Sequence, residues 1–368
     1  MANLALYRKY RPQTFSEIIA QKHIVKILTN AIASDMISHA YLFSGPRGTG
    51  KTTMGRLFAK AINCKNRKKG EYEPCNKCES CLEINKGNSM DLIEIDAASN
   101  RGIDDIRELK ETIRFVPSKS KYKVFIIDEF HQLTREASNA LLKILEEPPA
   151  HAIFILATTE IQKVLSTIIS RCQGFSFYKL TVPEIVERLK IILEKEKIKY
   201  EEPALFLIAA EATGSIRDAE SLLDKIISFS GPGEKIKKET IVKILGNVEN
   251  EVIIKFIGYL LEKDTKNAIS FLNESIDKGV DVQQFIKVLN NYLREILLLK
   301  IDAKFEDSLT LVLSKEEKEK IIEFAEKFSS EKIYECLQEF LEAESKIRYS
   351  SIPQLPIELA IVELCQKK

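Results

Sequence analysis

The fold of this chain is decided by one stretch, Gly45-Pro46-Arg47-Gly48-Thr49-Gly50-Lys51-Thr52. It matches the phosphate-loop pattern G-x-x-x-x-G-K-[ST] at every fixed position. The glycines let the backbone turn tightly and bring its N–H groups close to phosphate oxygens, and the N-terminus of the following helix points at the same anion. Lys51 then supplies a charge for the β- and γ-phosphates, and the Thr52 hydroxyl suits a Mg²⁺ ligand. The stretch predicts a site for a nucleoside triphosphate with Mg²⁺.

The flanking sequence supports this interpretation over a glycine-rich turn that matches the pattern by chance. Residues 40–44 form a short apolar run that predicts a strand. Residues 53–62 carry apolar side chains at helical spacing, which predicts a helix directly after the loop. Strand, loop and helix is the context in which a phosphate loop occurs.

Composition narrows the class of protein. A chain of 368 residues with 45% hydrophobic residues has room for two or three packed domains. The net charge of +1 argues against an overall basic surface, so any DNA contact has to come from a local patch or from an assembly. The sequence shows no apolar run of membrane-spanning length and no signal-peptide segment, so we expect a cytoplasmic protein with no membrane partner.

Four of the seven cysteines are clustered as C-x10-C-x2-C-x2-C at Cys64, Cys75, Cys78 and Cys81. Four thiolates suit a closed tetrahedral Zn²⁺ site, and a closed site is structural because no coordination position stays open for a reaction. The alternatives are four unrelated buried cysteines or a redox pair, which needs only two cysteines. The spacing predicts a zinc knuckle over residues 64–81.

A second chemical landmark follows an apolar run at residues 123–127. Such a run reads as a buried parallel strand, and it ends in Asp128 and Glu129. Because α/β folds bind ligands at the C-terminal ends of strands, Asp128 is placed to hold Mg²⁺, and Glu129 to orient or deprotonate an attacking water. We interpret His131 as a hydrogen-bonded helix residue and not as a catalytic group.

The apolar patterns also predict the other helices and strands of residues 4–170. We expect an irregular arm at residues 4–15, a helix that opens at Ser16 and runs through Ala31, strands at 91–97 and 152–157, a helix at 135–147 and another at 165–170. The second of these strands ends in Thr158 and Thr159, whose hydroxyls could contact the γ-phosphate or the water, or could be ordinary strand-end groups.

Beyond about residue 179 the strand patterns cease. Helices are expected to begin near Val182, Glu202, Gly214 and Lys238, and Gly231-Pro232-Gly233 forms a break before the last of these. From about residue 247 to the end, the sequence reads as successive amphipathic helices, and we find no internal repeat. The chain therefore reads as an α/β domain followed by two helical parts.

These features together resemble the gamma/tau family of bacterial DNA polymerase III, the ATPase subunits of the clamp loader. The matching segments, in the family's order, are residues 7–12, 45–52, the four-cysteine knuckle, Asp128-Glu129, 141–149, 157–159, Ser170-Arg171-Cys172 and 214–217. They cover residues 1 to about 240. The helical remainder resembles the family's oligomerisation collar only in general character.

The resemblance implies a fold and a function. The fold is an α/β AAA+ P-loop domain at residues 1–178, a parallel sheet flanked by helices with the zinc knuckle inserted, then a helical lid at 179–243 and an all-α collar at 244–368. The function is ATP-driven opening of the sliding clamp and its release on primed DNA after hydrolysis. The implied partners are the delta and delta prime subunits and further gamma/tau copies in a ring of five, with the clamp and the DNA.

The resemblance also assigns roles to residues. The catalytic set is Lys51, Glu129, Thr159 as sensor 1, Arg171 as an arginine finger toward a neighbouring subunit, and Arg217 as sensor 2 from the lid. The nucleotide-binding set is Tyr7, Arg8, Tyr10, Pro12, Ile18, Ile19, Gly45, Pro46, Arg47, Gly48, Thr49, Gly50, Lys51, Thr52, Thr53 and Arg217, with Mg²⁺ at Thr52 and Asp128. The DNA-facing set is Ser99, Asn100, Arg101, Gly102 and Ile103. Without the family, Arg171 would read as a surface arginine paired with a nearby carboxylate.

Two departures from the family pattern are Ala20 in place of a glycine and Phe130 in place of a smaller residue, and neither removes a chemical group. The length fits either a gamma-length product or a truncated tau. Two competing functions are a non-hydrolysing scaffold subunit, which would lack the intact phosphate loop, and another AAA+ DNA-processing ATPase, against which the knuckle and Ser170-Arg171-Cys172 argue.

Overall fold

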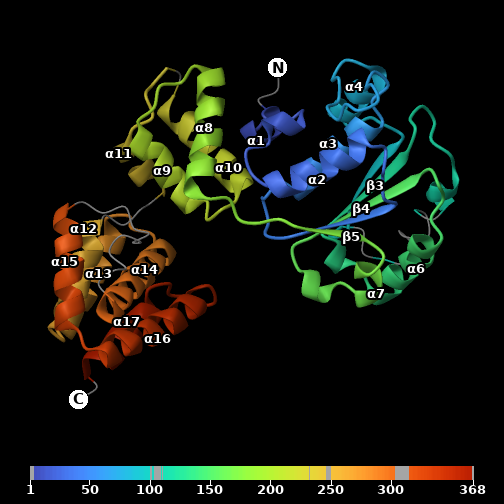
Figure 1. Cartoon of the computed structure of the whole chain (residues 1–368). Helices are drawn as coiled ribbons and strands as arrows, with labels where there is room; N and C mark the ends of the chain where they lie inside the picture. The colour runs from blue at the N-terminus through green and yellow to red at the C-terminus, as the bar shows by residue number, and fades with distance from the viewer. Residues whose placement is uncertain are drawn as a thin grey trace. The chain divides into compact units, whose positions relative to one another are not determined.

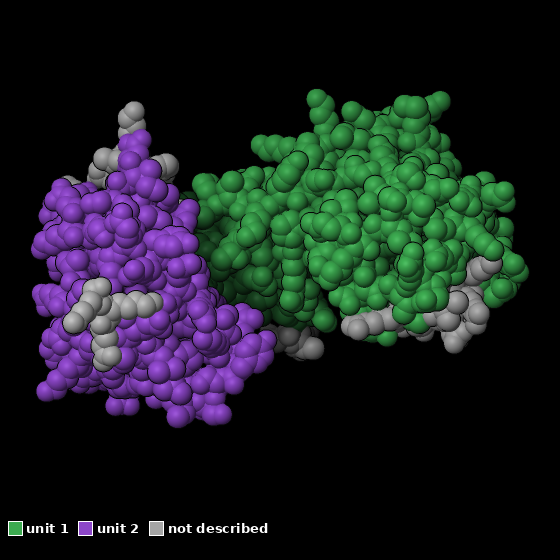
Figure 2. Space-filling view, turned by 90° about the horizontal axis from the view of Figure 1, so that it is seen from below, with its two compact units in different colours: residues 1–236 green, residues 237–368 purple. Residues whose placement is uncertain are grey.

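The computed structural model of the protein describes residues 4–99, 102, 109, 111–231, 233–245, 250–302 and 315–366. The chain forms two compact units, residues 1–236 and 237–368, which Figure 2 shows in separate colours. Among the described residues, none of the helices combines the length and the apolar character needed to cross a membrane. The domain boundaries expected at 178/179 and 243/244 stay a prediction.

The first unit is built on a five-stranded parallel sheet with the strand order β2-β3-β4-β1-β5. The strands are β1 (Ala40–Ser44), β2 (Leu92–Asp96), β3 (Lys123–Asp128), β4 (Ala152–Thr158) and β5 (Gln173–Ser176). Ser44 is in register with Thr158, Ile127 with Leu156 and Asp96 with Asp128. The C-terminal ends of β1, β3 and β4 therefore meet at one edge of the sheet, where the phosphate loop begins.

Helices cover both faces of this sheet, as Figure 1 shows: α2 (Lys22–Ala33) and α3 (Lys51–Ile62) on one face, α6 (Arg135–Glu146) and α7 (Ser166–Ile169) on the other. The first face is rich in aromatic rings, and the Tyr41 and Phe58 rings lie 4.7 Å apart between β1 and α3. On the second face Phe125 and Phe154 stack at 5.3 Å beneath Leu141 of α6. This double packing fixes the start of α3, and with it the phosphate loop.

Shorter elements surround the sheet. These are α1 (Leu6–Lys9), α4 (Glu79–Lys86) and the 3₁₀ turns η1 (Phe15–Glu17), η2 (Phe130–Gln132) and η3 (Ile161–Lys163). Glycine at position 87 ends α4 with a positive φ of 75°.

Three helices complete the first unit: α8 (Val182–Glu196), α9 (Glu202–Glu211) and α10 (Ile216–Ser230). Thr181 and Glu184 form a capping box at the start of α8, where Pro183 stands in the first turn. The Ser215 side chain accepts the Asp218 N–H at 3.2 Å and caps α10. Because α1 packs on α10, the N-terminal arm lies against this helical part of the unit.

The second unit is entirely helical in its described residues. Its helices are α11 (Lys238–Leu245), α12 (Asn250–Leu261), α13 (Thr265–Asp277), α14 (Val282–Ile301), α15 (Lys315–Lys327), α16 (Ser330–Ile347) and α17 (Leu355–Gln366). The rings of Phe256, Phe285 and Phe340 form the centre of its core. Asp264, Asp281 and Ser329 cap three of the helices through their side chains.

The structure confirms the strands expected near 40–44, 91–97, 123–128 and 152–157 and the helices expected after Lys51, Arg135, Val182, Glu202 and Gly214. The expected helix opening at Ser16 is wrong, because the chain turns through η1 and Gln21 adopts φ 63° before α2 starts at Lys22. The arm contains one helical turn, α1, instead of being irregular throughout. The edge strand β5 was not expected, since its run of four residues contains Gly174 and carries no apolar alternation of useful length.

Candidate nucleotide site and cysteine cluster

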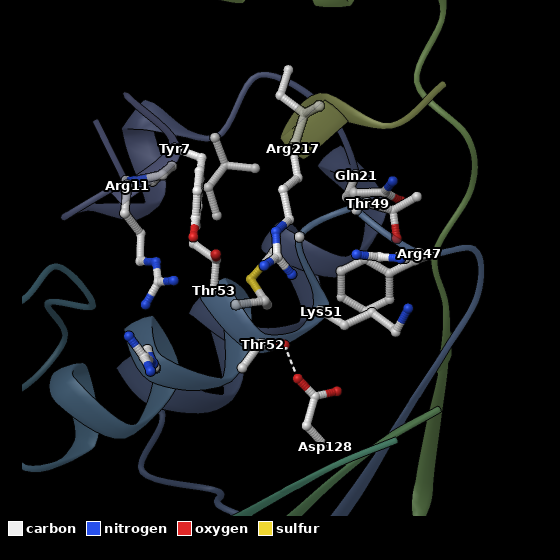
Figure 3. A pocket seen from close by; sticks show the side chains of 18 of the residues that line it. Tyr7, Arg11, Gln21, Arg47, Thr49, Lys51, Thr52, Thr53, Asp128 and Arg217 are labelled. Carbon is white, nitrogen blue, oxygen red and sulfur yellow. Dashed lines mark hydrogen bonds between the residues drawn. The ribbon is translucent and has the colours of Figure 1, made fainter. Parts of the chain in front are cut away.

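A cavity of about 500 Å³ lies over the phosphate loop of the first unit. Its walls come from the loop, the first turn of α3, the segment 18–21, the ends of β2 and β3, the arm and the start of α10; Figure 3 shows side chains from several of these elements. The predicted nucleotide-binding residues that line it are Tyr7, Arg8, Pro12, Ile18, Ile19, Arg47, Gly48, Thr49, Gly50, Lys51, Thr52, Thr53 and Arg217. Segments far apart in the sequence thus converge on one cavity.

The phosphate loop depends on its glycines. Gly45, Gly48 and Gly50 have φ values of 140°, 74° and 99°, which L side chains rarely adopt. A Cβ on Gly45 would stand 2.3 Å from the Phe177 carbonyl oxygen, and one on Gly48 would stand 1.9 Å from Ser215 Oγ. The loop is therefore closely enclosed by the rest of the first unit.

Lys51 and Thr52 begin α3 at the floor of the cavity. The Lys51 ammonium is buried and donates to the carbonyls of Gly45 and Pro46 at 2.7 and 2.8 Å. Burial lowers the pKa of Lys51, while the nearby carboxylates Glu129 and Asp128 act in the opposite direction. The Thr52 hydroxyl donates to Asp128 Oδ2 at 2.7 Å, as the dashed line in Figure 3 shows. The two residues predicted to hold Mg²⁺ therefore lie together.

Glu129 has a strained backbone with φ 47° and ψ 43°, a conformation that costs an ordinary residue about 1–3 kcal/mol. Its carboxylate accepts the Thr159 hydroxyl at 3.0 Å, so the predicted catalytic base and the predicted sensor residue are in contact. His131 Nδ1 lies 3.6 Å from the same carboxylate and 3.1 Å from Thr158 Oγ1. The interpretation of His131 as a hydrogen-bonded residue is confirmed, but its place beside Glu129 was not foreseen.

The arm and α10 approach each other across the mouth of the cavity. The Arg217 guanidinium lies over the Tyr7 ring, with Cζ 5.0 Å from the ring centroid, and Arg8 Cζ lies 5.6 Å from the same centroid. Hydrogen bonding from Arg8, with further help from Arg217, lowers the pKa of the Tyr7 hydroxyl despite the opposing effect of burial. Tyr7 therefore holds Arg217 at the cavity mouth.

A buried ion pair links α8 and α10 near the contact between Tyr7 and Arg217. Arg188 of α8 and Glu220 of α10 are 8% and 6% exposed, and Nε lies 2.8 Å from Oε1. Arg188 also donates to the Tyr10 carbonyl. Burial raises the pKa of Glu220, and Arg188 opposes that shift. Both residues line the cavity, and no periodicity or motif in the sequence distinguished them from the rest of their helices.

Gly45 and Pro46 of the predicted nucleotide-binding set do not line the cavity, and neither does Tyr10. Its hydroxyl donates to Glu196 at 2.7 Å, and Lys9 contacts the same carboxylate at 2.5 Å. Tyr10 therefore fastens the arm to α8.

The four clustered cysteines meet in space. Their Sγ atoms all lie within 4.8 Å of one another, and Cys75 Sγ is 4.0 Å from Cys81 Sγ. Four sulfurs at roughly 2.3 Å from one Zn²⁺ are about 3.8 Å apart in a tetrahedron, so the cluster fits the ion. Although burial opposes it, the N–H groups of Lys77 and Cys78 lower the pKa of the Cys75 thiol to about 6. Burial raises the pKa of the Cys81 thiol.

The knuckle is joined to the segment that leads to the cavity. The Glu73 carboxylate accepts the N–H groups of Phe15 and Ser16, each at 2.9 Å. Asn76 Nδ2 donates to the Gln13 carbonyl at 3.1 Å. Loss of order in the knuckle would therefore reach residues 13–16.

Comparisons with known proteins agree with this arrangement. Sequence models of three families match the chain: DNA polymerase III, delta subunit, over residues 20–181; the ATPase lid domain of the DNA polymerase III clamp loader subunit over 184–232; and domain III of DNA polymerase III subunits gamma and tau over 236–368. The DNA polymerase III subunit gamma of Buchnera aphidicola subsp. Baizongia pistaciae is 38% identical over 98% of this chain and 96% of its own length. The chain belongs to the gamma/tau family of DNA polymerase III subunits.

Two further comparisons complete this result. The DNA polymerase III subunit tau of Bacillus subtilis is 44% identical over the full length of this gamma/tau chain, which spans 64% of that relative. Among solved structures, the Thermotoga maritima RuvB Holliday junction branch migration motor is 19% identical, with a TM-score of 0.48 over 68% of this chain and 79% of that one. The family assignment rests on the gamma and tau relatives, and it confirms the AAA+ fold class and sets aside the other AAA+ machines considered above.

Arg171 of this gamma/tau chain lies away from the cavity. Its Nη1 donates to the Thr167 carbonyl and its Nη2 contacts Glu146 Oε1, both at 2.7 Å. The guanidinium is about one-third exposed and Glu146 about one-half exposed. Water screens the pair, so this ion pair contributes little stability. A role toward a neighbouring subunit stays a prediction.

The loop predicted to face DNA falls largely outside the described residues. Asn100, Arg101 and Ile103 are among those not described, and the Ser99 N–H donates to the Asp96 carbonyl at 3.1 Å. The placement of this loop toward DNA therefore stays a prediction.

Proposed function

We propose that this chain is an ATP-hydrolysing motor subunit of the bacterial replicative clamp loader, within the DNA polymerase III holoenzyme. ATP binding opens the sliding clamp, and hydrolysis releases it on primed DNA. One observation carries the proposal: the phosphate loop, the Thr52–Asp128 pair, Glu129 and Arg217 surround a single cavity in a chain of the gamma/tau family.

The residues divide the chemistry among them. The loop N–H groups and the Lys51 ammonium bind the phosphates, and Thr52 and Asp128 would hold Mg²⁺, which would neutralise phosphate charge. Glu129 accepts the proton of the attacking water, while Thr159 fixes the carboxylate through its 3.0 Å hydrogen bond. Arg217 brings positive charge from α10 to the phosphates. Ile18, Ile19 and Tyr7 form the apolar wall for the base.

The cysteine cluster supplies structure and not catalysis. Cys64, Cys75, Cys78 and Cys81 would hold one Zn²⁺, and four thiolate ligands would leave no site on it for substrate. Its function is to order the knuckle and, through Glu73 and Asn76, the segment before the cavity wall.

The partners belong to this proposal as well. The second unit forms the collar of a ring with delta, delta prime and further gamma/tau copies, and Arg171 reaches the nucleotide of the adjacent subunit. Residues 99–103 face the DNA backbone, and the assembly works in the cytoplasm.

The test is the ATPase rate of the chain assembled with delta and delta prime, measured alone, with primed DNA, with the sliding clamp and with both. We expect the rate to rise most with both present, because the reaction is coupled to loading. Lys51→Ala in the same assembly is the control for contaminating ATPases and should stay at background. A rate that is unaffected by both clamp and primed DNA would contradict the proposal.

A further inference from the structure

A second cavity, of about 430 Å³, lies between the arm, α3 and α4 in the first unit. Its charged lining residues are all cations: Arg8, Arg11, Arg56, Lys60 and Lys86. It shares Arg8, Arg11 and Arg56 with the nucleotide cavity, whereas Lys60 and Lys86 line only the second. Figure 3 shows the Arg11 side chain well apart from that of Lys51, so this basic wall is not part of the phosphate loop.

Lys60 is the strongest indication that something negative binds here. The residue is 2% exposed, and its ammonium donates to Gln13 Oε1 at 2.7 Å and to Asn85 Oδ1 at 2.9 Å. Both acceptors are neutral amides, so in the described part of the chain this buried charge has hydrogen bonds but no carboxylate within ion-pair distance. Glu17, Glu73 and the Cys64 and Cys81 sulfurs act on this charge without a hydrogen bond to it, and an anion in the cavity would compensate it directly.

Three of the other cations in the wall have donor groups that are not fully paired. Arg56 contacts Glu94 through Nη2, but its Nε is buried and has no hydrogen-bond partner among the described residues. Within the same part of the chain, the side chains of Arg11 and Lys86 form no ion pair. Among the described residues, Glu94 is thus the one carboxylate in direct ion-pair contact with these five cations, while Glu17 and Glu73 act on Lys60 without a direct contact.

Two acidic residues that act on Lys60, Glu17 and Glu73, are already hydrogen-bonded to backbone groups. Glu17 accepts the Gln13 N–H at 2.6 Å. Glu73 accepts the N–H groups of Phe15 and Ser16. Both carboxylates stabilise backbone turns of the arm, and neither lines the second cavity.

We propose that this second cavity binds a phosphate-bearing anion, separately from the nucleotide over the phosphate loop. Guanidinium and ammonium groups are the donors that bind phosphate oxygens most strongly, and a cavity of this size accepts several linked phosphates. The anion is either a free oligophosphate or the phosphodiester backbone of a nucleic acid strand; the chemistry of recognition is the same. The inference does not depend on the proposed function, because Lys60 and Lys86 lie outside the nucleotide cavity.

The experiment uses the full chain carrying Lys51→Ala, so that the phosphate loop contributes little to binding. Sodium tripolyphosphate is titrated by calorimetry, and a fluorescent single-stranded oligodeoxythymidine by anisotropy, both at low salt and without ATP. The test variant adds Lys60→Met and Lys86→Gln. The matched control adds Lys69→Gln and Lys77→Gln, which remove the same charge from exposed positions outside the cavity. Circular dichroism checks folding, and Lys86→Glu alone replaces the test variant if Lys60→Met does not fold.

We expect the test variant to bind tripolyphosphate at least about tenfold more weakly than its parent, because it loses two charged donors, and the control to stay within about twofold. Binding of tripolyphosphate alone identifies a small free anion as the ligand. Binding of the oligonucleotide, displaced by tripolyphosphate, identifies a strand backbone. The proposal is overturned if neither probe binds, if the test variant binds as its parent does, or if the control loses as much affinity as the test variant.

Discussion

The backbone N–H of Ile216 donates to the carbonyl oxygen of Gly48 at 3.1 Å. The first turn of α10 therefore touches the phosphate loop directly, one residue before Arg217. Ser215 also packs against the loop, because its Oγ fills the space where a Gly48 Cβ would stand. Any change in the loop is thus transmitted to the helix that carries Arg217.

Gly48→Ala tests this contact. The substitution places a methyl 1.9 Å from Ser215 Oγ and strains a residue at φ 74°, so we expect α10 to move off the loop and ATP affinity to fall by about tenfold or more. Gly87→Ala is the matched control, since φ is 75° there and nothing lies within 4 Å of the new Cβ. It should lose about 1–2 kcal/mol of stability and keep its ATP affinity. Equal ATP affinity in the two variants would argue against the contact.

Binding and hydrolysis should separate at the cavity floor. Lys51→Ala removes a buried positive charge from the phosphates and should weaken ATP binding. Glu129→Gln keeps the shape and the Thr159 hydrogen bond but cannot accept a proton, so ATP should still bind while hydrolysis falls by about 10²–10⁴. Equilibrium binding and single-turnover hydrolysis measure the two effects. Hydrolysis by Glu129→Gln at the wild-type rate would show that another group is the base.

The Arg188–Glu220 pair predicts a pH effect on stability. Arg188→Ala leaves a carboxyl that is 6% exposed without its cation, at a cost of about 3–5 kcal/mol at neutral pH. The pKa of Glu220 is already raised by burial above its ordinary 4.5 and rises further in the variant. A raised carboxyl pKa means that the folded form binds the proton more tightly. The stability deficit of the variant is therefore smallest below pH 4.5 and grows as pH rises through the folded pKa.

Chemical denaturation of wild type and Arg188→Ala across this pH range measures the effect. Arg188→Ala with Glu220→Gln is the control, because the amide does not titrate and the pH dependence of the deficit should disappear. A deficit that is constant with pH in the single variant would show that Glu220 stays uncharged or reaches water.

The parts of the site that could be predicted from sequence are those whose functional residues lie close together in one short segment. The phosphate loop, the strand ending in Asp128-Glu129 and the four cysteines each occupy one short segment, and the structure brings their members together as expected. The register of β1, β3 and β4 explains why segments separated by about 80 residues meet, since parallel strands share one C-terminal edge.

The parts that escaped prediction depend on tertiary contacts. Arg188 and Glu220 sit on amphipathic helices whose pattern does not reveal which charged residues turn inward. Gln21 adopts a left-handed backbone and binds the Tyr178 backbone through both ends of its amide, so a helix expected from Ser16 begins only at Lys22. Tyr10 is predicted to bind the nucleotide, but its hydroxyl contacts Glu196 of α8 instead.

Metal removal should loosen two segments at once. The purified chain should carry about one zinc with sulfur ligands at roughly 2.3 Å. Chelation should raise hydrogen exchange over residues 64–81 and, through Glu73 and Asn76, over residues 13–16, while ATP binding stays largely intact. Cys336→Ser, a buried cysteine in the second unit, is the control and should retain the zinc. Metal analysis without zinc, or disulfides among the four cysteines, would falsify the site.

The last prediction concerns Arg171, whose guanidinium contacts Glu146 and does not line its own subunit's nucleotide cavity. If it acts on the neighbouring subunit, Arg171→Ala should bind ATP normally yet fail to hydrolyse it in the assembly with partners and DNA. Arginine fingers contribute about 10³–10⁵ in rate in other nucleotide hydrolases. Glu146→Gln is the control, because it removes the negative charge of the surface pair but keeps the Arg171 guanidinium, and it should remain active.

Mixing variants decides between action within a subunit and action between subunits. Arg171→Ala subunits keep Glu129, and Glu129→Gln subunits keep Arg171, so an interface formed by the two has one complete site. Assemblies made from both should therefore recover part of the activity that each lacks alone, in proportion to the number of mixed interfaces. An assembly that stays inactive although both variants are incorporated would contradict action between subunits. So would full activity of Arg171→Ala alone, because the Glu146 contact would then account for the whole role of this arginine.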